Sequence, residues 1–325
     1  MALNPSQMFP TNPLYFKQVV ALAGGVGGAK LAHGLARILA PNQLTIIGNT
    51  GDDFNYYGLH VSPDLDTLMY TLAELAHPVQ GWGIQDDTRQ MQTMLRRYGE
   101  EAWFGIGDLD LATNVLRSHQ LGQGKSLSAV TAWLAEKLGI TARLLPMTDD
   151  PLTTVVETRE YGLLAFQEYF VRHRWQPTVT RLIYDGAHRA QPAPGVLEAL
   201  SQAELIVICP SNPVLSIEPI LQVRAIREAL ENRRVPCVAV SPVIAGAALK
   251  GPTVKIMHEL GLRPDVVGIS NYYGILLDGL VIDEQDRHAE AAIHQKIAFT
   301  DIRMTSIADR ERLAREVLHF AGSLR

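Results

Sequence analysis

A run of glycines, Gly24-Gly25-Val26-Gly27-Gly28, is the first feature that suggests chemistry, and Lys30 follows it closely. Glycines between a strand and a helix let the backbone approach an anion, which the free N–H groups and the positive dipole end of the helix then bind. Lys30, on the first helical turn, can reach a phosphate as a point charge. The run therefore predicts a phosphate site, with a simple tight turn as the alternative.

Two well-known glycine motifs do not fit this run. In a dinucleotide fingerprint, Lys30 would stand where the third glycine belongs, and Asn49 rather than an acid follows the second strand. In a P-loop, Ala29 replaces the last glycine and Leu31 replaces the hydroxyl residue that binds the metal. These mismatches argue against an NAD-dependent oxidoreductase.

Acidic side chains form the second signal. Asp52 and Asp53 lie in a loop after the second strand, and Asp64 and Asp66 lie at a helix start. Ligands of open α/β sheets bind at such strand ends, and Mg²⁺ uses one or two carboxylates together with substrate phosphates. The pattern predicts a phosphate and metal site. Asp is also a common helix cap, and Asp64 is the residue that best fits that alternative.

Polar pairs elsewhere offer further candidates. Asp108 and Asp110 lie at one junction between predicted elements, and Asp149 and Asp150 lie at another. Such acids either bind substrate hydroxyl groups or are solvated residues of turns. Pro210-Ser211-Asn212-Pro213 follows an apolar strand, so Ser211 and Asn212 bind a base or phosphate, or cap the next helix.

Several aromatic residues gather in sequence around the second loop and the segment after it. They are Phe54, Tyr56, Tyr57, Trp82, Trp103 and Phe104. A flat heterocycle can stack on such rings, although most aromatic residues fill cores. The histidines show no metal-ligand spacing, and no Ser/His/Asp arrangement can be read.

These residues need a scaffold, and the apolar pattern predicts a doubly wound α/β fold. Short continuous apolar runs, typical of strands buried on both faces, alternate with helical patterns and indicate a mainly parallel, Rossmann-like sheet. The strands expected for the whole chain lie at 16–23, 44–48, 142–145, 153–157, 178–183, 205–209, 235–240 and 266–269. The expected helices lie at 29–39, 64–76, 87–98, 111–121, 127–138, 216–230, 251–260 and 306–321.

The strand signal fades between the two halves of this pattern. We therefore expect a nucleotide-binding core formed by 16–80 and 141–325, and a helical insertion at 81–140.

Composition narrows the class of protein. The chain has 325 residues, 47% of them hydrophobic and 19% charged, as in an ordinary globular protein. A net charge of −5 offers no basic field for nucleic acid or an anionic membrane. The two cysteines, Cys209 and Cys237, lie in apolar runs and are expected as buried free thiols. With no membrane span and no secretory signal, we expect a cytoplasmic protein.

Taken together, the motifs resemble the 2-phospho-L-lactate transferase family of deazaflavin coenzyme F(420) biosynthesis. The segments that carry the resemblance run in order from about Val19 to Arg315. They are Ala23 to Lys30, Asn49 to Asp53, Ser62 to Thr67, Gly81 to Ile84, Leu145 to Asp150, Pro210 to Pro213 and Ser241 to Ile244.

The resemblance implies a reaction and its substrates. A phospho-three-carbon acid passes from a guanosine diphosphate conjugate to the terminal ribityl hydroxyl of 7,8-didemethyl-8-hydroxy-5-deazariboflavin, with release of GMP and with Mg²⁺ as cofactor. The three-carbon unit can be lactyl, enolpyruvyl or glyceryl, and a homodimer is expected.

The resemblance also implies roles for individual residues. Those expected against the guanosine diphosphate moiety are Gly25, Gly27, Gly28, Lys30, Ser211 and Asn212. Asp53 and Asp66 become the catalytic and metal-binding candidates. The deazaflavin side would be lined by Thr67, Trp82, Asp108 and Asp149, with the insertion nearby.

The chain departs from the family pattern at one place. Leu109 stands where the family has arginine and Asn114 where it has histidine, two side chains able to donate to a phosphate. A nucleotide-sugar-binding regulator of the gluconeogenesis-factor type, without transferase activity, is the alternative function that these substitutions favour.

Overall fold

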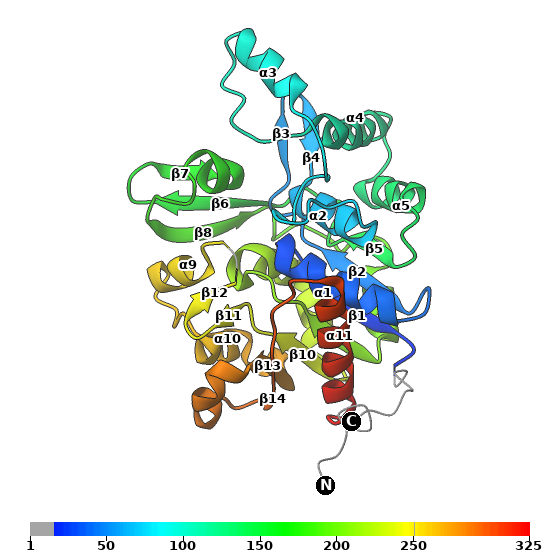
Figure 1. The fold of residues 1–325 in the computed structure, drawn as a ribbon, viewed down its shortest axis with the longest axis vertical. Helices are drawn as coiled ribbons and strands as arrows, with labels where there is room; N and C mark the ends of the chain where they lie inside the picture. The colour runs from blue at the N-terminus through cyan, green and yellow to red at the C-terminus, as the bar shows by residue number, and fades with distance from the viewer. Residues whose placement is uncertain (1–15, 250) are drawn as a thin grey trace.

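The computed structural model describes residues 16–249 and 251–325, and its centre is a seven-stranded sheet (Figure 1). The strand order is β14-β13-β10-β9-β1-β2-β5, and every neighbouring pair is parallel. The strands are β1 (Val19–Ala23), β2 (Leu44–Gly48), β5 (Arg143–Pro146), β9 (Leu205–Ile208), β10 (Cys237–Val240), β13 (Gly279–Asp283) and β14 (Lys296–Thr300).

Helices cover both faces of this sheet, so the predicted doubly wound α/β class is confirmed. The α-helices of the described chain are α1 (Gly25–Ile38), α2 (Pro63–Leu72), α3 (Gln90–Arg97), α4 (Asp108–Gly122), α5 (Leu127–Lys137), α6 (Val196–Gln202), α7 (Glu218–Gln222), α8 (Arg224–Glu231), α9 (Thr253–Glu259), α10 (Val266–Tyr273) and α11 (Ile307–Gly322). Shorter 3-10 and π segments are η2 (Glu168–Arg172), η3 (Pro213–Ile217), η4 (Gly274–Leu276) and η5 (Glu284–Ala292).

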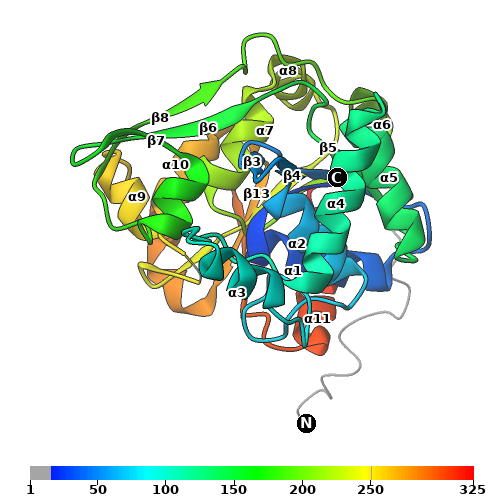
Figure 2. The same ribbon diagram turned by 90° about the horizontal axis from the view of Figure 1, so that it is seen from above.

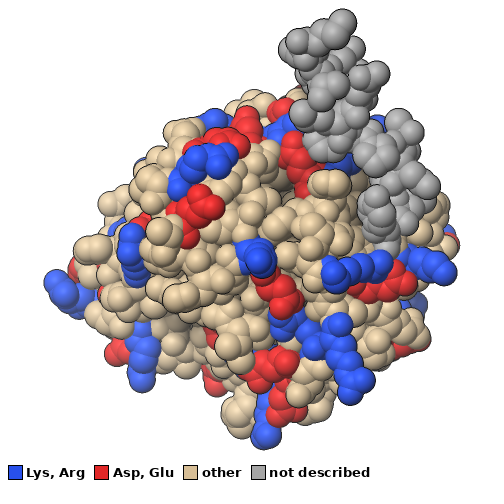
Figure 3. Space-filling view, turned by 90° about the horizontal axis from the view of Figure 1, so that it is seen from below, with Lys and Arg blue, Asp and Glu red and all other residues tan. Residues whose placement is uncertain are grey.

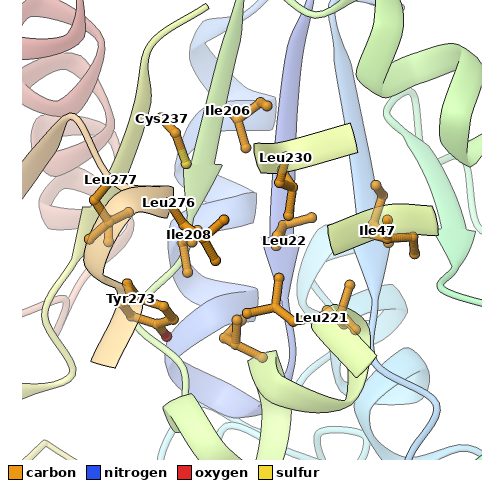
Figure 4. Close-up of a cluster of buried hydrophobic side chains, with 14 of the residues drawn as sticks. Leu22, Ile47, Ile206, Ile208, Leu221, Leu230, Cys237, Tyr273, Leu276 and Leu277 are labelled. Atoms are coloured by element: carbon orange, nitrogen blue, oxygen red, sulfur yellow. The ribbon is translucent and has the colours of Figure 1, made fainter. Parts of the chain in front are cut away.

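Alternate side chains of each strand enter two separate cores. Val20 and Leu22 of β1 pack with α6, α7, α8 and α10, whereas Val19 and Ala21 pack with α1, α2, α5 and α11. Figure 4 shows part of the first core, where Leu22, Ile208 and Leu230 lie together. Because both faces are buried, the strands read as continuous apolar runs rather than alternating ones.

Two peripheral structures rise from the carboxyl ends of the strands. One begins with the hairpin of β3 (Phe54–Tyr56) and β4 (Leu59–Val61) and continues through α3 and α4. The other, here called the arm, is an antiparallel sheet of β6 (Thr153–Thr158), β7 (Gly162–Ala165) and β8 (Val179–Asp185), with η2 between β7 and β8. Figures 1 and 2 both place the arm and α4 on opposite sides of the molecule.

The structure corrects several predicted elements. The expected strand at 266–269 is helix α10, which begins where the Asp265 side chain accepts a hydrogen bond from Gly268 N. A short apolar run buried on most sides has no periodicity that separates strand from helix. β7, β13 and β14 were missed, a small hairpin of β11 (Val243–Ile244) and β12 (Ala247–Ala248) was not expected, and the helix predicted at 216–230 is divided into η3, α7 and α8.

The remaining predicted elements are present, β2 with its predicted bounds and the others with shifted ends. Helix α1 begins at Gly25, four residues before its predicted start, so the glycines form its first turn rather than a preceding loop. Cys209 and Cys237 are buried free thiols, as expected. Basic and acidic side chains are interspersed on the face seen from below, so no field of one sign covers that face (Figure 3).

Candidate functional site

A cavity of about 690 Å³ lies at the carboxyl ends of β1, β2 and β9. After β1 the chain continues to β2 on one side, whereas β9 begins the half of the sheet on the other side. This is the topological switch point at which open α/β sheets bind ligands. Residues of both peripheral structures and of the segment 302–305 after β14 complete the cavity wall.

A second hollow, of about 710 Å³, lies at the opposite ends of the strands. Its wall contains the ion pairs Arg233–Asp278 and Arg325–Glu204. The carboxylates and glycines singled out from the sequence are absent from its lining, so the first cavity is the candidate site.

The glycines at the start of α1 are required by close packing. A Cβ on Gly24 would lie 2.4 Å from Asp64 Oδ2, one on Gly27 would lie 2.2 Å from the Pro210 carbonyl oxygen, and one on Gly28 would lie 2.3 Å from Ser211 Oγ. Gly25 has a φ of +61°, where glycine is favoured. Gly25 and Gly27 line the cavity, whereas Gly28 lies behind its wall.

Asp64 lies at the N-terminus of α1. Its Oδ1 accepts a 2.7 Å hydrogen bond from Gly25 N, and its Oδ2 accepts a 2.9 Å bond from Asn49 Nδ2. Burial raises the pKa of Asp64 to about 6, although both hydrogen bonds favour the charged form. The residue expected as a cap of its own helix therefore bridges two elements, and its side chain makes no capping bond within α2.

Ser211, Asn212 and Lys30 line the same end of the cavity. Ser211 Oγ accepts a 3.3 Å bond from Gly24 N, and Asn212 Oδ1 caps η3 through Val214 N and Leu215 N, both at 3.1 Å. Lys30 Nζ donates a 2.8 Å bond to the Met304 carbonyl, which ties α1 to the segment after β14.

Asp52, Asp64 and Asp66 are buried and line the cavity. Burial raises the pKa of Asp52 well above its usual range, and repulsion from Asp64 and Asp53 raises it further. Asp53 does not line the cavity: its Oδ2 lies 2.9 Å from His60 Nε2 and accepts a 2.7 Å bond from Ser62 Oγ, whereas its Oδ1 is buried with no hydrogen-bond partner among the described residues.

Helix α4 supplies a positive charge that the sequence did not predict. Arg117 is fully buried and bonds to both carboxylate oxygens of Asp66, at 3.1 Å from Nη1 to Oδ2 and by a shorter contact from Nη2 to Oδ1. Burial raises the pKa of Asp66, and Arg117 partly offsets this. In the sequence, Asp110 and Arg117 are seven residues apart on one predicted helix. This spacing alone does not indicate that Arg117 pairs with Asp66 of α2.

The two departures from the family pattern lie behind the cavity or outside it. Leu109 is 55% exposed, and neither Leu109 nor Asn114 lines the cavity. Asn114 is fully buried, and its Nδ2 donates to Asp110 Oδ1 at 3.2 Å while its Oδ1 accepts from Arg117 Nη1 at 2.9 Å. Asn114 therefore connects Asp110 and Arg117 within α4.

Aromatic rings form part of the cavity wall. Trp82 and Phe104 contribute from one peripheral structure, and Phe166, Phe170 and Trp175 contribute from the arm. The Phe166 and Phe170 rings are stacked with their centroids 5.4 Å apart. Most of the predicted aromatic cluster instead forms a small core, in which the Phe54 and Phe104 centroids are 4.7 Å apart. Sequence reasoning missed the three aromatic residues of the arm.

Thr67 lines the cavity next to Asp66, but Asp108 and Asp149 lie away from it. Asp108 accepts hydrogen bonds from Thr88 Oγ1, Gln90 N and Met91 N at the start of α3, and these lower its pKa. Asp149 accepts from the backbone N and Oγ of Ser128 at the start of α5. Both residues join structural elements.

No group of three or more His, Cys, Asp or Glu side chains in the described ranges forms a preassembled metal site. A cation in the cavity would therefore need ligands from a substrate as well as from the protein. Within those same ranges, no helix is long and apolar enough to cross a membrane.

The fold and the cavity define a doubly wound α/β protein that has a helix N-terminus, buried carboxylates and an aromatic wall at its switch point. A family model described as 2-phospho-L-lactate transferase CofD matches residues 19–320. The chain belongs to this family, and it is an enzyme of the transferase class.

Named relatives agree with this membership. The chain is 43% identical to a phosphoenolpyruvate transferase of Kitasatospora aureofaciens, over 95% of this chain and 99% of the relative. It is 35% identical to a 2-phospho-L-lactate transferase of Methanocaldococcus jannaschii, over 94% of this chain and 99% of the relative. The resemblance inferred from the motifs is confirmed, and an NAD-dependent oxidoreductase is excluded.

A solved structure shares the fold. A member of the UPF0052 family from Bacillus halodurans superposes with a TM-score of 0.60 at 14% identity, covering 93% of this chain and 99% of that one. At this identity the likeness concerns the fold alone.

Proposed function

We propose that the protein transfers a phospho-three-carbon acid, with phosphoenolpyruvyl as the preferred unit, from its guanosine diphosphate conjugate to the deazaflavin ribityl hydroxyl in coenzyme F(420) biosynthesis. The observation that carries this proposal is a single cavity that is lined by a helix N-terminus, by buried carboxylates and by aromatic rings. The preference for enolpyruvyl is supported by the greater identity to relatives named for phosphoenolpyruvate.

The donor binds at the start of α1. There, first-turn N–H groups and the helix dipole attract the diphosphate, and Ser211 and Asn212 lie on the opposite strand end. Lys30 adds a positive charge and holds the segment 302–305, which forms the outer wall. This arrangement fixes the donor phosphorus in front of the buried carboxylates.

The acceptor binds between the aromatic rings. The deazaflavin is flat and largely apolar, so it stacks against Phe166 and Phe170 of the arm and against Trp82 on the other side. Its ribityl chain then extends towards Asp66 and Thr67. Positioning of this kind supplies much of the acceleration of phosphoryl transfer.

The residues present fit a magnesium ion. Asp53 has a buried oxygen with no hydrogen-bond partner among the described residues, and the pKa of Asp66 is raised by burial, so added positive charge would favour the ionised form of Asp66. Asp53 and Asp66 would hold the ion, which, when bound, would neutralise developing phosphate charge. The homodimer and the cytoplasmic location stay predictions.

The test is an assay with purified protein, Mg²⁺, the deazaflavin acceptor and each of the three guanosine diphosphate donors in turn. We expect GMP release and an acceptor product of increased mass, fastest with the enolpyruvyl donor. A mixture without acceptor measures background hydrolysis. Folded protein that binds GDP but yields no product with any donor would favour the regulatory alternative.

A variant pair tests the aromatic wall. Phe170→Ala should raise the KM for the deazaflavin and leave the KM for the donor nearly unchanged, because Phe170 belongs to the arm rather than to the glycine turn proposed to bind the donor. Leu163→Ala is the matched control, since Leu163 is 61% exposed on β7 of the same arm and lies outside the cavity. Equal acceptor KM values in the two variants would contradict the placement.

A further inference from the structure

Four carboxylates line the cavity, and they differ in how their oxygens are occupied. Both oxygens of Asp64 accept short hydrogen bonds, from Gly25 N and Asn49 Nδ2. Both oxygens of Asp66 bond to the Arg117 guanidinium. Each of these carboxylates is therefore fixed by donors on both oxygens, and these bonds favour its charged form although burial raises its pKa.

The other two carboxylates are Asp52 and Asp110. Asp52 has an amide donor on each oxygen, Asn49 Nδ2 at 3.5 Å from Oδ1 and Gln167 Nε2 at 3.4 Å from Oδ2. Asp110 receives both of its side-chain bonds on Oδ1, from Tyr70 Oη at 2.7 Å and Asn114 Nδ2 at 3.2 Å. Within the described chain, Asp110 Oδ2 has no hydrogen-bond donor.

Asp110 also lies on the acceptor side of the cavity. It belongs to the first turn of α4, its Oδ1 accepts a bond from Tyr70 of α2, and Phe104 of the cavity wall packs against the same small core as Leu111, the next residue of α4. The glycines proposed to receive the donor begin α1, where Asp64 rather than Asp110 bonds to Gly25 N. A hydroxyl group of the deazaflavin side chain would meet Asp110 before it met the carboxylates near the glycines.

We propose that Asp110 is the catalytic residue that accepts the proton of the acceptor hydroxyl. This inference rests on the proposed function. The hydroxyl oxygen forms a bond to the phosphorus that carries the three-carbon acid, the bond from that phosphorus to the GMP oxygen breaks, and GMP leaves with the electron pair. The hydroxyl proton passes to Asp110 Oδ2 and then to solvent.

The surroundings of Asp110 suit this role. Burial is the main cause that raises its pKa to about 7, and the charges of Asp66 and Asp87 raise it further, whereas Tyr70 and Arg117 lower it. A base whose pKa lies near the working pH is the most effective. Turnover should therefore rise with pH as Asp110 loses its proton.

The first test is Asp110→Asn, assayed with Mg²⁺, donor and acceptor from about pH 6 to pH 9. General-base catalysis contributes about 10²–10⁴-fold, so we expect kcat to fall at least about 100-fold while the donor KM stays within about threefold. The rise of kcat with pH should disappear. Asp86→Asn, a change of the same type at an exposed position outside the cavity, should keep the rate and the pH profile of the unaltered enzyme.

A second variant keeps the inference testable if Asp110→Asn fails to fold. Tyr70→Phe removes a donor to Asp110 Oδ1, which destabilises the carboxylate and raises its pKa. The pH at which kcat is half-maximal should therefore move upward, with the plateau largely kept. An unmoved profile would overturn the inference.

The outcomes separate this inference from the proposed function. Absence of GMP release by the unaltered enzyme would contradict the proposed function itself. An active enzyme whose Asp110→Asn variant keeps its rate and its pH profile would contradict only the role of Asp110. Loss of rate with an unchanged pH profile would also contradict it, because a structural role predicts that result.

Discussion

Asp64 Oδ1 accepts a 2.7 Å hydrogen bond from Gly25 N, so a carboxylate already lies at the helix N-terminus where the donor diphosphate is proposed to bind. Two anions would then share one helix start. The raised pKa of Asp64, about 6, means that a modest added repulsion protonates it near neutral pH.

This arrangement predicts proton uptake when GDP binds. The bound diphosphate should raise the pKa of Asp64 further, so affinity should fall as pH increases from about 6 to 8. Calorimetry without Mg²⁺ near pH 7, in two buffers of different ionisation enthalpy, measures the uptake. Asp64→Asn should abolish it. Equal apparent binding enthalpies for the unaltered protein in the two buffers would contradict the prediction.

Gly27→Ala should destabilise the protein without touching a charged group. The added Cβ would lie 2.2 Å from a backbone carbonyl, that of Pro210, which cannot rotate away as a side chain can. Overpacking of this kind costs about 1–3 kcal/mol, measured as the free energy of unfolding in urea. Gly122→Ala is the control: a Cβ there meets nothing within 4 Å, and at the last residue of α4 the change should alter the unfolding free energy by less than about 1 kcal/mol.

The buried pair Arg117 and Asp66 should show strong coupling. Arg117→Met leaves an unpaired carboxylate in the interior, which costs about 3–5 kcal/mol of unfolding free energy. The double variant with Asp66→Asn should recover part of that cost, because no unpaired charge remains. Urea unfolding of both single variants and the double variant gives the coupling energy. Simple additivity of the two costs would show that the pair does not act as a unit.

The two cysteines should be unreactive in the native protein. Both are buried, and burial raises the pKa of Cys237 to about 12 and the pKa of Cys209 as well, so almost no thiolate forms at neutral pH. A thiol reagent such as dithionitrobenzoate should label neither residue until guanidinium is added, and then both. Rapid labelling of native protein would be incompatible with the described packing.

The sheet could be predicted from the sequence because its strands are continuous apolar runs separated by helical patterns. The prediction was wrong where periodicity carries little information. Val266 to Ile269 are apolar, adjacent and fully enclosed, and only the Asp265 cap distinguishes their helix from a strand. β14 could not be predicted from an apolar run, because it is an edge strand of intermediate burial that begins with a lysine.

The cavity could be predicted only in part. Some of the lining residues could be predicted from local motifs, because each of them follows or begins an element in the chain. They are Gly25, Gly27, Ser211 and Asp66. The pairing of Arg117 with Asp66 joins residues 51 positions apart, and Gln167 reaches Asp52 over 115 positions. Such contacts depend on how α4 and the arm pack, which no local spacing encodes.

The sheet supplies the floor of the cavity, whereas its aromatic wall is carried by elements that lie outside the sheet. The arm packs in a small core of Val156, Phe166 and Tyr169 that it shares with η3 and α9. The proposed acceptor placement would therefore let acceptor scope be redesigned on the arm, by resizing Phe166 or Phe170, while the strands of the central sheet are left as they are. Protein engineers could then test new hydroxyl-bearing acceptors with variants that change only the arm.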